Sequence, residues 1–242
     1  MRKILGCLRK ADKKFNLIET GDKIAVGLSG GKDSMLLLYA LSLYQKFSKK
    51  NYKLEAVCVN LGFSDFNTAA ITDYAKGLGI PLKILSTEIA DIVFNIRKEK
   101  NPCSLCAKMR KGALYEYISN KGFNKAAFAH HADDAVQTLI MSMLYESRLN
   151  TFSPKSFLSR RNVTLIRPLI LAGETDIKSA VARNEIPVAK NPCPVDFTTK
   201  REESKEILAA LNNYASGASE HIFKALLNSD KYNLWDKDFS KI

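Results

Sequence analysis

The stretch K-I-A-V-G-L-S-G-G-K-D-S, residues 23–34, decides the fold of this chain. Its first part, residues 23–27, is a short apolar run that ends in glycine, as in a buried strand of a parallel sheet. Residues 33–45 carry leucines at helical spacing, which predicts a helix. A strand, a glycine-rich turn and a helix in this order place backbone N–H groups and the positive end of the helix beside a bound anion.

The rest of the chain continues the alternation of strand and helix. Apolar runs predict further strands at residues 54–61, 81–85, 125–129 and 164–167, and helical spacing predicts helices at 68–78, 106–119 and 134–145. This order predicts the α/β class, with a doubly wound parallel sheet covered by helices on both faces. Ligands of such sheets bind beyond the carboxyl ends of the strands, where the strand order reverses. Residues 46–53 and 147–162 are predicted loops.

The length of 242 residues fits one α/β domain with short terminal elaborations. We expect a single domain over residues 1–242 with helical terminal extensions. Within it, residues 1–20 form an N-terminal helical extension, residues 21–190 the nucleotide-binding core, and residues 191–242 a C-terminal segment that carries the third cysteine of the candidate site described below.

Charge and hydropathy narrow the class of partner. The 37 Lys and Arg residues outnumber the 25 Asp and Glu residues, which leaves a net charge of +12. Such a surplus favours a polyanionic partner, although a solvated basic surface would have the same composition. No apolar run is long enough to cross a membrane, and the N-terminus lacks the apolar region of a signal peptide. We therefore expect a cytoplasmic protein without a membrane partner.

The turn after the first strand has the residues that a phosphate-binding loop needs. Glycines let the backbone turn tightly around an anion, serines add hydroxyl donors, Lys32 adds a cation, and Asp33 can hold Mg²⁺. The spacing differs from the Walker A loop, because Asp33 stands where that loop has a hydroxyl residue. An incidental glycine-rich turn is the structural alternative. The candidate nucleotide contacts here are Gly27, Leu28, Ser29, Gly30, Gly31, Lys32, Asp33 and Ser34.

The string S-G-G-K-D-S resembles the PP-loop of the ATP pyrophosphatases, and H-H-A-D-D, residues 130–134, resembles a second element of that family that lies over the nucleotide. The resemblance implies that ATP is cleaved between its α and β phosphates and that AMP is transferred to a substrate. It also implies nucleotide contacts at Asn60, at Ala129, where the family has glycine, and at Asp134. One carboxylate of the Asp133–Asp134 pair could instead cap the following helix.

Three of the five cysteines are spaced like ligands. Cys103 and Cys106 lie about one helical turn apart, so both can face one ion, and Cys193 lies between two prolines in a rigid turn. Three thiolates suit a [4Fe-4S] cluster with one open iron or a zinc with one exchangeable position. A disulfide relay that carries a persulfide is a further alternative. Cys7 and Cys58 are interpreted as packing residues.

From about residue 21 to residue 208 the chain resembles the tRNA 2-thiocytidine synthetases. The matching pieces include P-C-S-L-C, the following Arg110, the H-H-A-D-D element, I-R-P-L at 166–169 and P-C-P around Cys193. The resemblance implies an ATP- and [4Fe-4S]-dependent tRNA thiolase, in which adenylation of C2 of a pyrimidine, best a cytidine, makes its oxygen a leaving group that sulfur replaces. The catalytic candidates are Asp33, Lys32, Arg110 and Asp134, with Mg²⁺ beside the phosphates.

The expected partners are a tRNA, a sulfur donor that is either sulfide or a persulfide carrier, and a second copy of the chain in a homodimer. Among the basic residues, the sequence places the pairs Arg160–Arg161 and Lys200–Arg201 nearest the strand ends and Lys49–Lys50 farther away. Two alternatives stay open. One is a cluster-free PP-loop ligase or amidotransferase with a zinc site, and the other is a nucleotide-binding protein that senses redox state.

Overall fold

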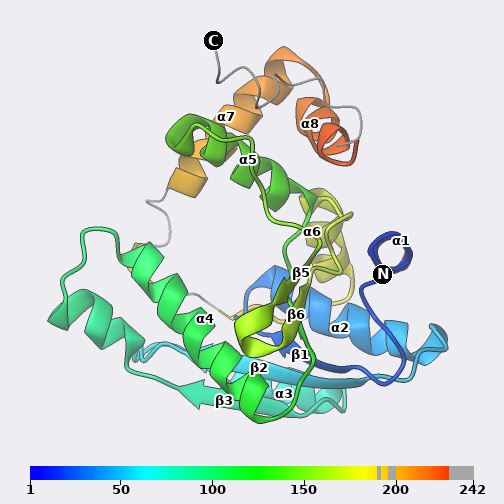
Figure 1. Cartoon of the computed structure of the whole chain (residues 1–242), viewed down its shortest axis with the longest axis vertical. Helices are drawn as coiled ribbons and strands as arrows, with labels where there is room; N and C mark the ends of the chain where they lie inside the picture. Colours follow the sequence, from blue (N-terminus) through cyan, green and yellow to red (C-terminus); the bar gives the residue numbers. More distant parts are fainter. Residues whose placement is uncertain (190–191, 196–199, 229–242) are drawn as a thin grey trace. The chain divides into compact units, whose positions relative to one another are not determined.

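The computed structural model describes residues 1–189, 192–195 and 200–228 (Figure 1). The described part of the chain groups into two compact units, and the prediction of a single domain over residues 1–242 stays a prediction. The first unit comprises residues 1–132 and 152–196 and contains the sheet, and the second comprises residues 133–151 and 197–242 and is helical where it is described.

The described residues form a six-stranded sheet in the order β3-β2-β1-β4-β6-β5. The strands are β1 (Lys23–Gly27), β2 (Lys53–Asn60), β3 (Leu82–Ser86), β4 (Lys125–Ala127), β5 (Lys155–Leu158) and β6 (Val163–Ile166). All neighbouring strands pair in parallel except β5, which is antiparallel to β6. The predicted α/β class with a parallel core is therefore confirmed.

The prediction of a loop over residues 147–162 is wrong in its second half. This segment contains β5 and a 3-10 turn, η2 (Ser159–Arg161), which leads through Asn162 in the left-handed region into β6. A short edge strand gives a weak periodic signal, since Phe157 on it is 62% exposed. Pairing with β6 rather than local preference decides its conformation.

Helices cover both faces of the sheet, as the alternation predicted. On one side, α1 (Arg2–Phe15), α2 (Lys32–Phe47) and α6 (Glu174–Arg183) pack on each other, and α2 contacts β1. On the other face, α4 (Pro102–Asn120) packs Leu114 and Ile118 on Ala25, Val57 and Ala126 of the central strands (Figure 1). A π-helical turn, η1 (Asp91–Ile96), precedes α4, and α3 (Ala69–Gly77) contacts β3.

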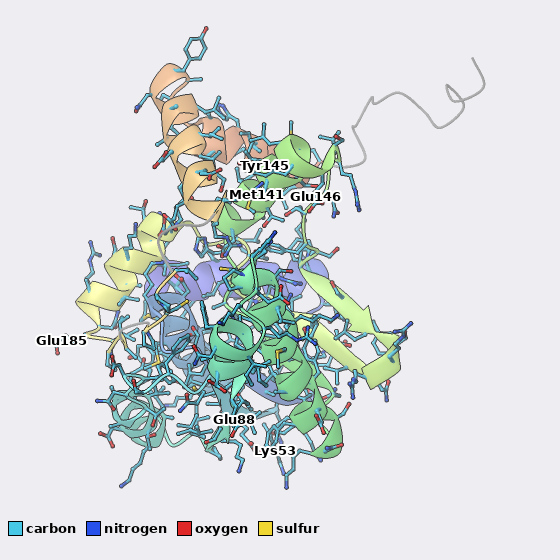
Figure 2. The ribbon with its side chains drawn as sticks, turned by 90° about the vertical axis from the view of Figure 1, so that its left-hand side faces the viewer. Lys53, Glu88, Met141, Tyr145, Glu146 and Glu185 are labelled. Atoms are coloured by element: carbon cyan, nitrogen blue, oxygen red, sulfur yellow. The ribbon has the colours of Figure 1, made fainter. Side chains whose placement is uncertain are left out.

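In the second unit α7 (Lys200–Tyr214) packs on α8 (Ala218–Leu226), and side chains of α5 (Ala132–Glu146) contact side chains of α7. Tyr145 near the end of α5, labelled in Figure 2, donates its hydroxyl to Glu203 at 2.7 Å. The Lys200 ammonium lies 3.8 Å from the centroid of the same ring. Among the described residues, no helix is long and apolar enough to cross a membrane.

The strand order reverses between β1 and β4. From β1 the chain adds β2 and β3 on one side, and β4 then returns to the other side of β1, followed by β6. The two central strands pair in register through Ile24–Lys125, Ala25–Ala126 and Val26–Ala127. The segments that follow β1 and β4 therefore leave the sheet at the same edge, which is where α/β sheets bind ligands.

A buried carboxylate fastens α1 to the rest of the first unit. Asp12 is 2% exposed and accepts hydrogen bonds from the Ile18 amide at 2.9 Å, the Tyr44 hydroxyl at 2.7 Å and the Lys50 ammonium at 2.5 Å. Lys50 also donates to the Ile18 carbonyl at 2.6 Å. The carboxylate thus joins α1, the segment after it, α2 and the loop before β2. Lys50 is held in this structural ion pair rather than presented to a ligand.

We expect Asp12→Ala to lower the free energy of unfolding by about 3 kcal/mol, because it leaves the Lys50 charge and the buried donors without their acceptor. Urea unfolding followed by circular dichroism measures the change. The control is Asp73→Ala on the exposed side of α3, which should change stability by less than about 0.5 kcal/mol. Equal stability of the two variants would show that the Asp12 network contributes nothing.

Candidate functional site

The segments after β1 and β4 pack directly on each other at the carboxyl edge of the sheet. A Cβ atom placed on Gly27 would lie 3.1 Å from Cε1 of Phe128. The Leu28 amide donates to the Val57 carbonyl of β2 at 2.9 Å, and the Phe128 amide donates to the Ile166 carbonyl of β6 at 3.0 Å. The ends of four neighbouring strands therefore support one continuous edge.

The glycine-rich turn is closed by its own serines. Ser34 in the first turn of α2 accepts from the Ser29 amide at 3.1 Å and donates to the Gly31 carbonyl at 3.0 Å. The Ser29 hydroxyl lies 3.1 Å from that of Ser34 and accepts from the Gly31 amide at 3.4 Å. Gly31 is the N-cap of α2, so the turn ends at the positive end of that helix. These hydrogen bonds hold the backbone of the predicted phosphate loop in a tight turn at the start of α2.

Gly30 is required by both its conformation and its surroundings. Its φ of +82° lies in the left-handed region, and an added Cβ would come within 2.9 Å of both Ala189 and Ile71. The Gly30 carbonyl accepts from the Ala189 amide at 2.9 Å. Beside this contact lies a cavity of about 260 Å³ lined by Asp65, Asn67, Ala70, Val188 and Ala189.

Lys32 at the start of α2 lies between two carboxylates. Its ammonium is 3.0 Å from Asp33 and 3.3 Å from Glu174, the first residue of α6. Burial alone lowers the pKa of Lys32, but the two carboxylates outweigh burial and raise this pKa above its ordinary value. Burial raises the pKa of Glu174, and Lys178 and Lys32 outweigh it and lower that pKa. A charged lysine is thus held beside the loop.

Sequence reasoning missed Glu174. Its only local signal is the spacing to Lys178, with which it forms an ion pair at 3.2 Å, and that spacing is ordinary for an exposed helix face. The contact with Lys32 joins residues from the two sequence segments that make up the first unit. Only the packing of α6 on α2 brings them together.

Asp33 has an oxygen placed for a ligand. Its Oδ1 atom is buried and has no hydrogen-bond partner among the described residues, and it lies 4.0 Å from Nε2 of His131. A buried carboxylate oxygen without a donor loses hydration free energy unless it binds a donor or a cation. Since Mg²⁺ prefers carboxylate oxygens close to phosphates, the residues present fit the metal that the sequence predicts.

The end of β2 places Asn60 at the same edge. Its side-chain oxygen accepts from the Gly62 amide at 2.9 Å, and its carbonyl accepts from the Thr87 amide and hydroxyl at 3.0 Å and 2.8 Å. An added Cβ on Gly62 would lie 2.6 Å from the Thr87 carbonyl. The loops after β2 and β3 are therefore locked together, and the Asn60 side chain serves that turn.

The helix that carries Asp133 and Asp134 begins earlier than the sequence predicted. The helix α5 begins at Ala132, whose amide donates to the Ala172 carbonyl at 3.0 Å, so Asp133 lies inside the first turn rather than at the cap. Asp134 belongs to the second unit, where it lies 3.8 Å from Arg201 of α7. Ala129 lies between β4 and α5. The sequence predicted a strand to Ala129 and a helix from residue 134, whereas β4 ends at Ala127 and α5 begins at Ala132.

The three predicted ligand cysteines all belong to the first unit. Cys103 is exposed in the first turn of α4, and Cys106, one turn later, and Cys193 are half-buried. Burial raises the pKa of the Cys106 thiol, the Arg110 guanidinium lowers it, and Cys193 and Cys103 raise it further. Within the described ranges, no group of three or more Cys, His, Asp or Glu side chains is gathered closely enough to hold a metal ion.

The two other cysteines have the environment of packing residues. Cys58 is fully buried in β2, and burial raises its pKa to about 11. Burial also raises the pKa of Cys7 in α1. Neither thiol therefore forms a thiolate readily at neutral pH.

The pair Arg160–Arg161 lies at the other edge of the sheet from the one that the sequence predicted. Because β5 runs antiparallel to β6, its end and η2 return to the amino edge of the sheet, where the Ser119 hydroxyl at the end of α4 donates to the Arg161 carbonyl. Arg160 and Arg161 are thus at the edge opposite the phosphate loop, contrary to the sequence prediction. At the cysteine end of α4, the exposed basic residues are Lys108, Arg110 and Lys111.

Comparisons with known proteins identify what the chain is similar to. The profile of the PP-loop domain family matches residues 6–202. The tRNA-cytidine(32) 2-sulfurtransferase of Pelobacter propionicus is 33% identical over 98% of this chain and 89% of the relative. The protein of the same name from Geobacter metallireducens is 32% identical over 100% of this chain and 95% of the relative.

Among solved structures, the U34-tRNA thiolase NcsA from Methanococcus maripaludis, with its [4Fe-4S] cluster, superposes with a TM-score of 0.75. It is 26% identical, and the match covers 93% of this chain and 78% of that one. The NH3-dependent NAD synthetase from Campylobacter jejuni superposes with a TM-score of 0.51 at 16% identity over 98% of this chain and 97% of that one, which shows the fold alone.

Proposed function

This chain belongs to the PP-loop domain family, and from that premise we propose that it is an ATP-dependent tRNA sulfurtransferase. The reaction replaces the C2 oxygen of a tRNA cytidine with sulfur. The observation that carries the proposal is that one unit contains both the phosphate loop closed by Ser29 and Ser34 and the three cysteines Cys103, Cys106 and Cys193. The full-length similarity to tRNA-cytidine(32) 2-sulfurtransferases supports this substrate, and the similarity to a thiolase with a [4Fe-4S] cluster supports the chemistry.

The reaction has two balanced steps. The C2 oxygen of the base attacks the α-phosphorus of ATP, and pyrophosphate leaves. Sulfur at the oxidation level of sulfide then attacks C2, the bond from C2 to oxygen breaks, AMP leaves, and the proton carried by the sulfur is released. Adenylation is needed because the C2 oxygen is a poor leaving group, whereas AMP is a good one.

The phosphate loop performs the first step. The turn around Gly30 directs backbone N–H groups at the phosphates, and the N-terminus of α2 directs the positive end of the helix dipole at them. Lys32, which Asp33 and Glu174 keep charged beside the loop, stabilises the departing pyrophosphate. Asp33 would hold Mg²⁺ through the buried oxygen that has no protein donor among the described residues. The catalytic role of Asp134 stays a prediction from the sequence.

The three cysteines and Arg110 take part in the second step. Cys103, Cys106 and Cys193 would hold a [4Fe-4S] cluster, which supplies one iron without a cysteine ligand to which sulfide can bind. Arg110 follows Cys106 by one turn of α4, is exposed, and lowers the pKa of that thiol. This position suits a contact with the phosphate of the activated base. The proposal includes a sulfur donor, which is either sulfide or a persulfide carrier whose outer sulfur is released as sulfide when a second thiol reduces the persulfide and forms a disulfide. It also includes a homodimeric state and a cytoplasmic location.

Asp33→Asn should reduce tRNA-dependent formation of AMP and pyrophosphate at least about 100-fold, because it removes the carboxylate charge for Mg²⁺ at the phosphates. The experiment follows both products from labelled ATP with unmodified tRNA and measures thiolated cytidine by mass spectrometry. Asp73→Asn on the exposed side of α3 is the control and should react like the unaltered protein. The proposed function is wrong if the unaltered protein forms no thiolated nucleoside with ATP, tRNA and sulfide.

Single replacement of Cys103, Cys106 or Cys193 by Ala should each remove the brown colour and the iron of anaerobically purified protein, together with thiolation. Cys7→Ala and Cys58→Ala are the controls and should retain all three properties, because those thiols are packing residues. Iron and acid-labile sulfide analysis measures the cluster. Zinc in place of iron in the unaltered protein, or thiolation by any of the three ligand variants, would contradict the three-cysteine cluster.

The double variant Lys108→Gln, Lys111→Gln should weaken tRNA binding and lower the slope of log K against log salt by roughly one unit for each lost phosphate contact. ATP affinity should stay the same. The matched control is Arg160→Gln, Arg161→Gln, an exposed basic pair at the opposite edge of the sheet. Filter binding at several salt concentrations measures both. Equal losses in the two double variants would mean that the surplus positive charge acts only as a diffuse field.

A further inference from the structure

Aromatic rings extend in a row from the phosphate loop along the carboxyl edge of the sheet. The ring of Phe128 lies against Gly27, where an added Cβ would come within 3.1 Å of it. The ring centroids of Phe128 and His130 are 6.0 Å apart, and those of His130 and Phe152 are 4.9 Å apart. All three rings are half-buried. The row therefore leads from β1 across β4 to the segment before β5, with its rings partly accessible.

Arg167, the residue after β6, fixes the far end of this row. Its Cζ atom lies 4.7 Å from the centroid of the Phe152 ring, and its Nη1 donates to the Ser153 carbonyl at 2.6 Å. The Arg167 amide donates to the Pro154 carbonyl at 3.0 Å. One residue thus holds Phe152 and the backbone after it by a ring contact and two hydrogen bonds.

The charge of Arg167 lacks the compensation that other buried charges in the first unit have. Arg167 is 8% exposed, forms no ion pair with a described residue, and has a buried Nε without a hydrogen-bond partner within the described ranges. The equally buried Lys125 lies 2.7 Å from Asp22. Burial lowers the pKa of Arg167. Burial of a cation that only a ring and a carbonyl compensate lowers the free energy of unfolding. A negatively charged ligand nearby would offset this loss.

A partly accessible ring surface beside an uncompensated cation matches one class of ligand. A nucleotide unit has a flat base that stacks on aromatic side chains and a phosphate that a guanidinium attracts. We propose that Phe152 and His130 form the surface on which the target pyrimidine of the RNA stacks, and that Arg167 is the positioning residue that holds Phe152 in that surface. This inference rests on the proposed function. Because the row begins at Gly27, a base stacked on it lies on the side of the loop that binds ATP.

The test uses the full chain with its cluster and a stem-loop RNA that carries the fluorescent analogue pyrrolocytidine in place of the target cytidine. Stacking quenches this fluorophore, so the unaltered protein should quench it on binding. Phe152→Leu keeps an apolar side chain but removes the ring, and should abolish most of the quenching. Phe152→Tyr restores a ring and should restore quenching. The matched control, Phe157→Leu, removes an exposed ring of neighbouring β5 and should quench like the unaltered protein.

Steady-state kinetics with unmodified tRNA supply the second measurement. Phe152→Leu should raise KM for tRNA roughly tenfold, as expected for one stacking contact, and leave the Kd for ATP unchanged. Arg167→Met should show the same pattern, and Arg167→Lys should be closer to Arg167→Met than to the unaltered protein, because an ammonium lacks the planar face and the fork of donors.

Three results overturn the inference. If the unaltered protein thiolates tRNA but Phe152→Leu keeps normal quenching and KM, the base docks elsewhere while the proposed function stands. If Phe152→Leu and Arg167→Met weaken ATP binding as much as they raise KM for tRNA, the row has a structural role only. If the unaltered protein neither thiolates tRNA nor quenches the labelled RNA, the proposed function fails and this inference fails with it.

Discussion

The close approach of β1 and β4 at the carboxyl edge of the sheet is the constraint on which the rest of the site depends. Gly27 has no side chain, and the ring of Phe128 lies in the space that a Cβ would need. The reversal of strand order puts the phosphate loop and the segment that follows β4 in contact, although about 100 residues of chain separate them. With that contact fixed, the buried oxygen of Asp33 lies beside His131 and the aromatic row begins at the loop itself.

Charge at this edge is arranged in two different ways. Around the loop, the cation of Lys32 is balanced by Asp33 and Glu174, which hold a positive charge where a phosphate would bind. Around Arg167, no described carboxylate balances the cation, which is buried against a ring. The first arrangement compensates a partly buried cation, and the second costs folding free energy that an anionic ligand can recover. This difference distinguishes the nucleotide side of the edge from the side that we assign to the RNA base.

The length of α4 separates two other chemical regions. Its first turns carry Cys103, Cys106 and the exposed basic residues, and its last turns pack at the amino edge beside η2. A rigid helix of 19 residues spans nearly 30 Å at about 1.5 Å per residue, which puts its two ends in different surroundings. The position of a basic residue along this helix therefore decides whether it can contact an RNA that reaches the cysteines.

The sequence by itself determined the α/β class through the alternation of apolar runs and helical spacing along the chain. It also predicted the phosphate loop and the cysteine pair, because each of these depends on residues within one or two helical turns of each other. The loop needs glycines and the start of a helix, and Cys103 and Cys106 need only helical spacing. The tertiary structure alone placed Glu174 beside Lys32 and Arg167 beside Phe152, and it placed Arg160 and Arg161 at the opposite edge. Those positions follow from α6 packing on α2 and from the antiparallel pairing of β5 with β6. Long-range pairings of this kind are set by burial and register over the whole sheet, for which no short sequence pattern exists.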